Sequence, residues 1–470
     1  MAKTCPHTVD GIRAGTPESP RSAGEIPSGP RGLPFLGSLL DVKRDRLGFL
    51  EKLQAFGDVV VFRMGPKRIY FVNCPAGVRR VLRDNYRNYR KGVGLTQAKP
   101  LIGDGLLTSE GLVWQRQRRM ARPAFEPASV DGYAAAIISA IEAMFGRWDL
   151  KQERKSPINI FSEMSRLTLD ILVRCLFGAD FAYRAETVER AFGIATEYAI
   201  HRMTALFAFT ARLPTPRNLR FSNALKDLDE VVQGLIASRR RSSDEAPDLL
   251  SELLRARDEN GAGMSDKQLR DEIMTILLAG HETTACTLAW AWYLIAMNPL
   301  AEKKLKRECN VTLQGRRPDK SDLGKLTYAN LVLRETMRLY PAVWLIPRKA
   351  IQADVIAGFP IPSGADVIIS PYALQRHPSH WNRPREFLPE RFNDIVNNGR
   401  DPDVYIPFGA GPRSCVGKNM ALLEAQLILI MITQRCSLTL ATDRDIVPIP
   451  LLTLRPATDL MMHVSLPHPN

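Results

Sequence analysis

The sequence predicts a mainly helical protein with a small β part. Residues 133–257 have the pattern of several amphipathic helices, and residues 265–297 that of one long, mostly apolar helix. Short β-branched and aromatic segments occur at 59–72, 355–370 and 446–464, where glycine and proline separate them. Helices therefore account for most of the predicted core, and the strands form a smaller part.

Length and composition set broad limits on the protein's class. A chain of 470 residues is long enough for two or three domains, and its 45% hydrophobic and 24% charged residues are typical of a soluble globular protein. Seven cysteines, an odd number at irregular spacing, do not indicate a disulfide framework, so we expect a reducing, intracellular compartment. The net charge of +14 fits an acidic protein partner, because no zinc-finger or RNA-binding motif supports nucleic acid.

The first 30 residues are rich in proline, glycine, serine and charge, without an apolar run. We expect residues 1–26 to be a mobile tail with neither a secretory signal nor a membrane anchor. Residues 27–470 are then one folded domain in the cytoplasm.

The N-terminal third of the chain predicts a hairpin and then a glycine-rich loop. Val59–Met64 and residues 68–72 flank Gly65, Pro66 and Lys67, which is typical of a β-hairpin. Residues 90–111 hold five glycines and little periodicity, so we expect a loop. Trp114 and Arg118 follow, four residues apart on one helical face, where surface packing or a cation–π pair is the simplest role.

The long helix begins at a capping signal, Ser265 with Gln268, and Pro299 ends it. Its 32 or so residues give a length of roughly 50 Å, enough to cross a whole domain. His281 and Glu282 near its middle argue against a membrane span. Glu282 and Thr283 side chains in a helix commonly bond to their own backbone or pair with a base.

Cys415 lies in a second informative stretch, residues 407–417, which has three glycines and two prolines. This composition predicts a tight loop just before the apolar helix 418–433, where the helix N-terminus favours a thiolate. A buried structural cysteine is equally compatible with the loop taken alone. Zinc is not indicated, because no second Cys or His lies nearby at ligand spacing.

The spacing of Phe408, Gly411, Arg413, Cys415 and Gly417 resembles the haem-binding loop of the cytochrome P450 superfamily. The resemblance implies that Cys415 ligates iron, that Phe408 packs beneath the haem and that Arg413 reaches a haem propionate. It also implies propionate or haem contacts for Trp114, Arg118, Arg348 and Gly417.

Two further motifs follow the same family order. Ala279 to Thr284 resembles the oxygen-activation motif, in which Glu282 and Thr283 deliver protons to dioxygen and Gly280 leaves room for it. Glu335 and Arg338 resemble the buried pair that Arg391 joins as a structural network, although such a pair is also common on helix surfaces.

The resemblance implies a cytochrome P450 fold, mainly α with a small β part, with haem b between the long helix and the Cys415 loop. The implied reaction is monooxygenation with O2 by a soluble, bacterial, monomeric enzyme. Electrons would come from an acidic ferredoxin or flavodoxin and its NAD(P)H reductase. A peroxide-driven haem-thiolate enzyme and a non-catalytic haem sensor are the alternatives, and Glu282 and Thr283 argue against both.

We expect a lipophilic substrate such as a terpenoid, fatty acid or steroid. The candidate pocket residues are Leu95, Ile102, Leu106, Phe207, Ala279, Gly280, Val343, Leu345 and Leu452. The apolar stretch 203–213 is either helix core or a lid over this pocket. A patch of free cations, Arg116, Arg119, Arg122 and Lys418, is expected to steer the electron donor.

Overall fold

The computed structural model describes residues 26–92, 95–152, 156–177, 188, 190–195, 197–198, 215–241, 248–393 and 399–465. Nearly all of the predicted tail, the stretch 203–213 and its Phe207 lie outside the described residues. The tail and the extent of the single domain therefore stay predictions.

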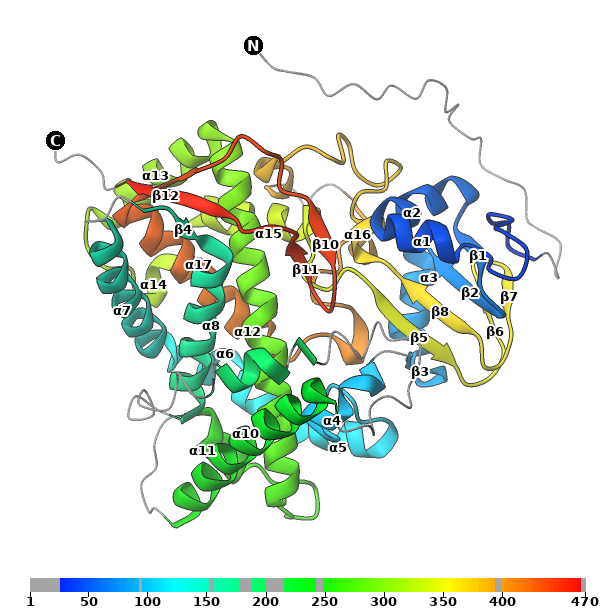
Figure 1. Cartoon of the computed structure of the whole chain (residues 1–470), viewed down its shortest axis with the longest axis horizontal. Coiled ribbons are helices and arrows are strands. Elements are labelled where there is room, and N and C mark those ends of the chain that lie inside the picture. Colours follow the sequence, from blue (N-terminus) through cyan, green and yellow to red (C-terminus); the bar gives the residue numbers. More distant parts are fainter. Residues whose placement is uncertain are drawn as a thin grey trace.

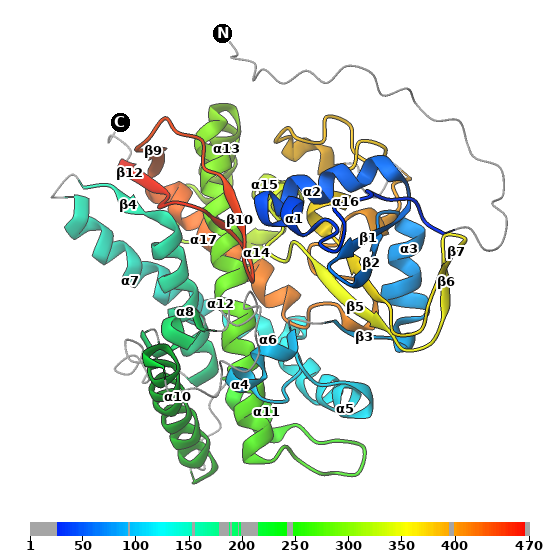
Figure 2. The ribbon, with the colours of Figure 1, turned by 45° about the vertical axis from the view of Figure 1, so that its right-hand side comes forward.

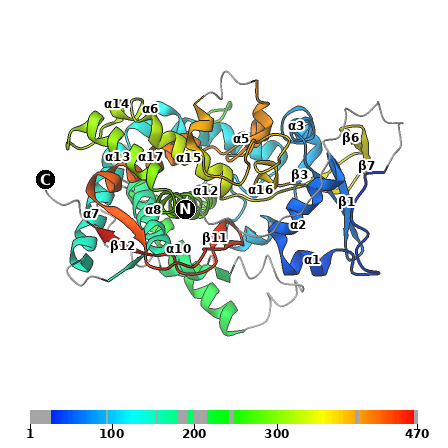
Figure 3. The same ribbon diagram turned by 90° about the horizontal axis from the view of Figure 1, so that it is seen from above.

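Helix α12 (Asp266–Met297) forms the centre of the molecule, and the other long helices lie around it (Figures 1 and 3). The Ser265 hydroxyl accepts the backbone N–H of Gln268 at 3.2 Å and caps the first turn. Helix α13 (Pro299–Leu313) begins directly after Asn298. From Ala285 to Ile295 every residue of α12 is buried, so the predicted long helix is confirmed as a core element.

The surrounding helices supply the apolar faces that cover α12. They are α8 (Ile160–Phe177), α10 (Pro216–Arg241), α11 (Leu249–Arg255), α15 (Thr327–Leu339) and α17 (Lys418–Arg435). Helix α7 (Ala134–Gln152) packs on α8 and α17. Figure 2 shows α8 running alongside α12, with α17 on its other side.

The principal β-sheet lies beside the helical part (Figure 1) and has the strand order β1-β2-β8-β5-β3. Its strands are β1 (Val59–Met64), β2 (Lys67–Val72), β3 (Tyr89–Lys91), β5 (Ile346–Ala350) and β8 (Asp366–Ile369). The β1–β2 hairpin confirms the prediction, with Met64 opposite Lys67. β2 and β8 pair in parallel although almost 300 residues separate them.

The glycine-rich region 90–111 differs from the predicted loop. β3 pairs Tyr89 with Ala350, and α4 (Lys99–Ile102) forms a short helix before α5 (Gly111–Ala121). The strand depends on a partner some 260 residues away, so local composition could not reveal it.

Smaller elements complete the fold. The other helices are α1 (Leu39–Arg44), α2 (Arg46–Leu53), α3 (Pro75–Arg79), α6 (Pro127–Asp131), α14 (Lys320–Leu323) and α16 (Pro371–Leu374). The other strands are β4 (Ile158–Asn159), β6 (Asp354–Ile356), β7 (Phe359–Ile361), β9 (Ser437–Leu440), β10 (Pro448–Pro450), β11 (Leu454–Pro456) and β12 (Met461–Ser465).

One described helical stretch, Pro127–Asp149, is long and apolar enough to cross a membrane by length and composition. A third of its most apolar window is buried inside the protein. The core helices of soluble proteins can have the same length and composition.

Candidate active site

The Cys415 loop is a sharp turn before α17. Gly409 and Gly411 have φ of 69° and 67°, and the N–H of Cys415 donates to the carbonyl of Phe408 at 2.9 Å. A Cβ on Gly411 would lie 1.9 Å from the carbonyl oxygen of Leu82. Glycine is therefore required there both for the backbone conformation and for the contact with the residues after α3.

Protein atoms lie around the Cys415 side chain and desolvate it, but part of the residue's surface is accessible. Burial raises the pKa of its thiol, while the Gly417 N–H, Arg118 and Lys418 act to lower it. The two observations agree if the sulfur borders an internal space. The thiolate that we expected from the helix N-terminus alone is thus not favoured, because burial outweighs that effect; coordination to a metal would deprotonate the thiol.

The middle of α12 also has accessible surface on one face. Ala279 is exposed and Ile276 and Thr283 are partly exposed, although buried residues flank them in a helix at the centre of the fold. Positions 276, 279 and 283 share one helical face. Figures 1 and 2 show the orange segment that precedes α17 beside α12.

A cluster of cations lies beside the Cys415 loop. Arg413 pairs with Glu110 and lies over the Trp114 ring, with its guanidinium carbon 4.5 Å from the ring centre. Burial, and next the nearby charge of Arg413, lower the pKa of Arg348 to about 10 and that of Lys91 to about 7. Among the described residues, the Nε and Nη1 atoms of Arg413 are buried without a hydrogen-bond partner.

This cluster could accept anionic groups. It holds three cations and one carboxylate, and the unpaired donors of Arg413 are costly unless a ligand accepts them. Sequence reasoning missed Lys91 and Glu110. The ammonium group of Lys91 donates to the carbonyls of Leu106 and Ser109 at 2.9 and 2.7 Å, so the segment between α4 and α5 fixes its position.

Arg118 does not join the cluster of Arg413, Arg348 and Lys91. Its Nη1 donates to the carbonyl of Ser414 at 2.7 Å, so it contacts the backbone of the Cys415 loop. Trp114 is buried and contacts Arg413. Helix α5 therefore reaches both the cation cluster and the loop from one face.

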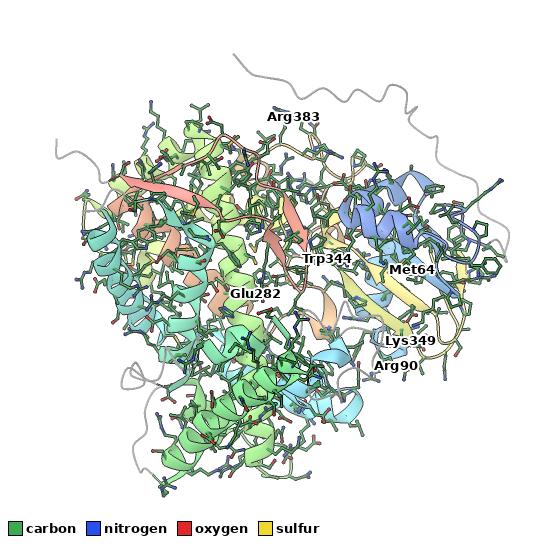
Figure 4. The ribbon with its side chains drawn as sticks, in the orientation of Figure 1. Met64, Arg90, Glu282, Trp344, Lys349 and Arg383 are labelled. Carbon is green, nitrogen blue, oxygen red and sulfur yellow. The ribbon has the colours of Figure 1, made fainter. Side chains whose placement is uncertain are left out.

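Glu282 is buried and held by β11. Its carboxylate accepts Nε of Arg455 at 2.6 Å and the hydroxyl of Thr453. The Thr283 hydroxyl donates to the carbonyl of Ala279 at 2.6 Å. Figure 4 labels Glu282 on the central helix. Thr453 and Arg455 lie more than 170 residues along the chain, and no local signal identified them.

The family model of cytochrome P450 matches residues 27–463. The chain belongs to the cytochrome P450 family. It is 37% identical over 434 residues to cyclooctatin synthase of Streptomyces melanosporofaciens, and the aligned region covers 90% of this chain and 92% of that protein. It is 32% identical over 426 residues to pentalenene oxygenase of Streptomyces avermitilis, with 90% and 94% coverage. Carotene epsilon-monooxygenase of Arabidopsis thaliana is 31% identical, with 92% and 85% coverage.

The P450 is therefore a monooxygenase with a haem-iron cofactor, and its mainly α fold with small sheets is confirmed. The described residues fit such a group. Cys415 offers one sulfur ligand at an internal space, and the Arg413 donors suit the carboxylates of a porphyrin. Within the described residues no group of three or more His, Cys, Asp or Glu side chains could hold a metal instead.

Gly280 lies where α12 meets α8. A Cβ there would lie 3.1 Å from Leu172 of α8, so the glycine allows the two helices to pack closely. Its expected role of leaving room for dioxygen stays a prediction. The neighbouring His281 is buried and its Nε2 lies 3.0 Å from the Ser165 hydroxyl. Burial lowers the pKa of His281 to about 4, so it is neutral in this helix contact.

The predicted pocket residues divide into two groups. Val343 is 40% exposed, and Leu95, Leu106 and Leu452 are partly exposed, as residues next to an open space would be. Ile102 has no exposed surface and belongs to the helical core, so it does not line an open space in this structure.

Leu345 packs with Trp344 on the core beneath the sheet. Trp344 is labelled in Figure 4 and donates its Nε1–H to the carbonyl of Leu451 at 2.9 Å. This bond ties the segment after α15 to the turn that carries Leu452.

The predicted network is buried, so a surface pair is excluded. Glu335 accepts Nε of Arg338 at 2.7 Å and Nε of Arg391 at 2.9 Å, and neither Glu335 nor Arg338 has exposed surface. Arg338 also donates to the carbonyl of Gln375, whose side chain accepts the N–H of Ile406 at 2.9 Å. The network thus extends to the residues just before Phe408.

The expected patch of free cations is wrong for three of its four members. Arg116 pairs with Asp258 at 2.6 Å, Arg119 with Glu259 at 2.7 Å and Arg122 with Glu126 at 3.2 Å. Lys418 is exposed and forms no ion pair with another described residue. The acidic partners come from other segments or from the next turn, which the charge pattern of α5 alone does not show.

Proposed function

We propose that this P450 inserts one oxygen atom from O2 into a C–H bond of a terpenoid-like small molecule. The second oxygen atom leaves as water, which consumes two electrons and two protons. The proposal rests mainly on the accessible face of α12 at Ala279 and Thr283. The apolar residues Val343 and Leu452, which were predicted to line the pocket, are also accessible. The printed names of relatives, cyclooctatin synthase and pentalenene oxygenase, support a terpenoid over a fatty acid or steroid.

Haem b would supply the oxygen activation and electron transfer that no side chain provides. Cys415 would bind its iron, and Phe408 and Gly417 would contact it. Arg413, Arg348 and Lys91 would hold its carboxylates, with Trp114 packed against Arg413. Arg118 would hold the ligand loop through Ser414.

Glu282 and Thr283 would supply protons at the open face of α12. The ion pair with Arg455 fixes the orientation of the Glu282 carboxylate. Because Thr283 donates to Ala279, the lone pairs of its hydroxyl stay available toward the open face. A hydroxyl next to a carboxylate can pass a proton inward without opening the site to bulk water.

Electrons would come from separate proteins, an acidic ferredoxin or flavodoxin and its NAD(P)H reductase. We propose a monomeric, cytoplasmic enzyme. The basic net charge of +14 supports an acidic donor.

Product formation with a surrogate ferredoxin and reductase tests the proposal. We expect NAD(P)H-dependent, O2-dependent oxidation within a panel of terpenes, fatty acids and steroids, and a substrate-induced shift of the haem spectrum for terpenes. Turnover that requires peroxide and ignores NAD(P)H would show a peroxygenase, and spectral shifts without any product would show a sensor.

The axial ligand is tested separately. Cys415→Ala should abolish the reduced-CO absorption band of thiolate-ligated haem, whereas Cys309→Ala, at a buried cysteine of α13, should retain it. Retention of the band in Cys415→Ala would show that another residue ligates the iron.

A further inference from the structure

An exposed apolar tip lies just before α1. Leu33, Pro34, Phe35 and Leu36, here called the Phe35 tip, form a turn closed by two backbone hydrogen bonds between Leu33 and Gly37. Phe35 is 91% exposed, and Leu33 and Leu36 are 51% and 41% exposed. A large exposed apolar side chain at a turn lowers solubility. A binding surface therefore explains the exposed Phe35 better than packing within the protein does.

The tip is held rigidly and away from the core. The N–H of Ser38 donates to the carbonyl of Arg63 at 2.8 Å, and the N–H of Gly65 donates to Leu36 at 3.0 Å, so the turn is fixed to the β1–β2 hairpin. Phe35 has φ of 59°, a conformation that costs energy for a residue with a large side chain. Figure 1 shows this blue segment at the edge of the molecule, far from the C-terminal helices.

Exposed cations occupy the segments that adjoin the tip along the chain and in the β1–β2 hairpin. Six exposed basic residues of the adjoining segments form what we call the cation ring: Arg31, Lys43, Arg44, Arg63, Lys67 and Arg68. None of the six forms an ion pair with another described residue. The exposed acids among residues 26–50 are Asp41 and Asp45, and Asp45 caps α2 by accepting the N–H of Gly48.

This combination favours one class of partner. Apolar side chains that project from a cationic surface match a membrane, in which acyl chains lie beneath anionic headgroups. An acidic protein would match the cations but would have to bury Phe35 and its neighbours in an apolar groove. We propose that the Phe35 tip and the cation ring bind the surface of an anionic lipid bilayer. Such contact needs no membrane-spanning segment and does not depend on which molecule the enzyme oxidises.

Co-sedimentation of the full-length holoprotein with lipid vesicles tests the proposal. The probes are vesicles of equal parts phosphatidylcholine and phosphatidylglycerol, and vesicles of phosphatidylcholine alone. We expect binding to the anionic vesicles that is about tenfold or more stronger than to neutral vesicles and that weakens with added salt.

Two variants separate the apolar and the charged contributions. Phe35→Asn removes the apolar group and suits the left-handed backbone, so the fold is retained. It should weaken binding to anionic vesicles about tenfold. The triple variant Arg63→Gln, Lys67→Gln and Arg68→Gln, which removes half of the cation ring, should weaken both the binding and its salt dependence. Leu112→Asn, at an 82% exposed position of α5, is the matched control and should bind as the original protein does.

Haem absorbance of each variant checks that the protein remains folded. No binding to anionic vesicles, or equal loss in Phe35→Asn and Leu112→Asn, would overturn the proposal. So would a dimer that Phe35→Asn dissociates, because a second copy would then cover the tip. Loss of ferredoxin binding in the triple variant, without any vesicle binding, would assign the cation ring to a protein partner.

Discussion

Glu282 shows how a single residue near the centre of α12 is constrained by a distant strand. Its carboxylate is buried, and Arg455 and Thr453 occupy one of its oxygens while Oε2 has no partner among the described residues. A buried carboxylate without its cation would take up a proton or turn away. Arg455 is therefore a positioning residue for the proposed proton path.

Replacing Arg455 tests this role. Arg455→Met should leave the reduced-CO band intact and lower the ratio of product to NAD(P)H consumed several-fold, because the Glu282 carboxylate loses the contact that orients it. Arg455→Lys, which keeps a charge, should recover part of the coupling. If both variants couple as the original enzyme does, Arg455 only supports the fold.

At the scale of elements, the loop between α4 and α5 is attached to α12 through buried carboxylates. The N–H of Asp104 donates to Asp271 and the N–H of Leu106 donates to Glu272, each at 3.0 Å. A Cβ on Gly103 would lie 2.1 Å from Asp271, so glycine is needed for this close approach. Burial raises the pKa of Glu272 to about 7.

This pKa predicts a pH dependence of stability. Between pH 4.5 and about 7 the folded state binds more protons at Glu272 than the unfolded state, so the free energy of unfolding falls as pH rises through this range. Glu272→Gln should remove that fall. Between pH 4.5 and pH 7, the free energy of unfolding of the variant should therefore rise relative to that of the original protein by on the order of 1 to 3 kcal/mol. Thermal unfolding at a series of pH values measures it.

Glu230→Gln, at an exposed carboxyl of α10 that pairs with Lys226, is the control and should leave the profile unchanged. A profile for Glu272→Gln that runs parallel to that of the original protein would contradict the assignment.

The network of α15 is a second connection between elements, and it leads to the ligand loop through Gln375. Arg338→Lys keeps the charge but cannot reproduce the two-pronged contact with Glu335 or the bonds to Gln375, so we expect a loss of about 3 to 5 kcal/mol. Chemical denaturation and the fraction of protein that retains haem measure the two effects. Arg334→Lys, on the same helix, is the control. Unchanged haem retention in a destabilised Arg338→Lys would separate the network from the ligand loop.

For the whole molecule, the proposed donor must approach a surface whose cations are mostly neutralised. Lys418, exposed at the start of α17, forms no ion pair with the described residues, whereas Glu259 already pairs with Arg119. Lys418→Glu should therefore slow reduction by an acidic ferredoxin several-fold at low salt, and Arg119→Glu should have a smaller effect. Stopped-flow reduction at two ionic strengths checks this. Equal rates in both variants at low salt would place the donor elsewhere.

The sequence by itself determined the parts that depend on local patterns. The capping signal at Ser265, the apolar face of α12 and the stop at Pro299 fixed the central helix, because caps, periodicity and proline act within a few residues. The β1–β2 hairpin followed from Gly65 and its neighbours in the same way. The spacing around Cys415 indicated the family and the sharp turn before α17, since that turn is encoded by its own glycines.

The tertiary structure alone decided which distant residues meet these elements. Arg455 reaches Glu282 from 173 residues away, the pairing of β3 with β5 sets Lys91 opposite Arg348, and Leu172 of α8 packs against Gly280. The acidic partners of Arg116 and Arg119 likewise come from the segment before α12. Contacts of this kind form only when packing of the core brings remote segments together, so no local pattern in the chain announces them.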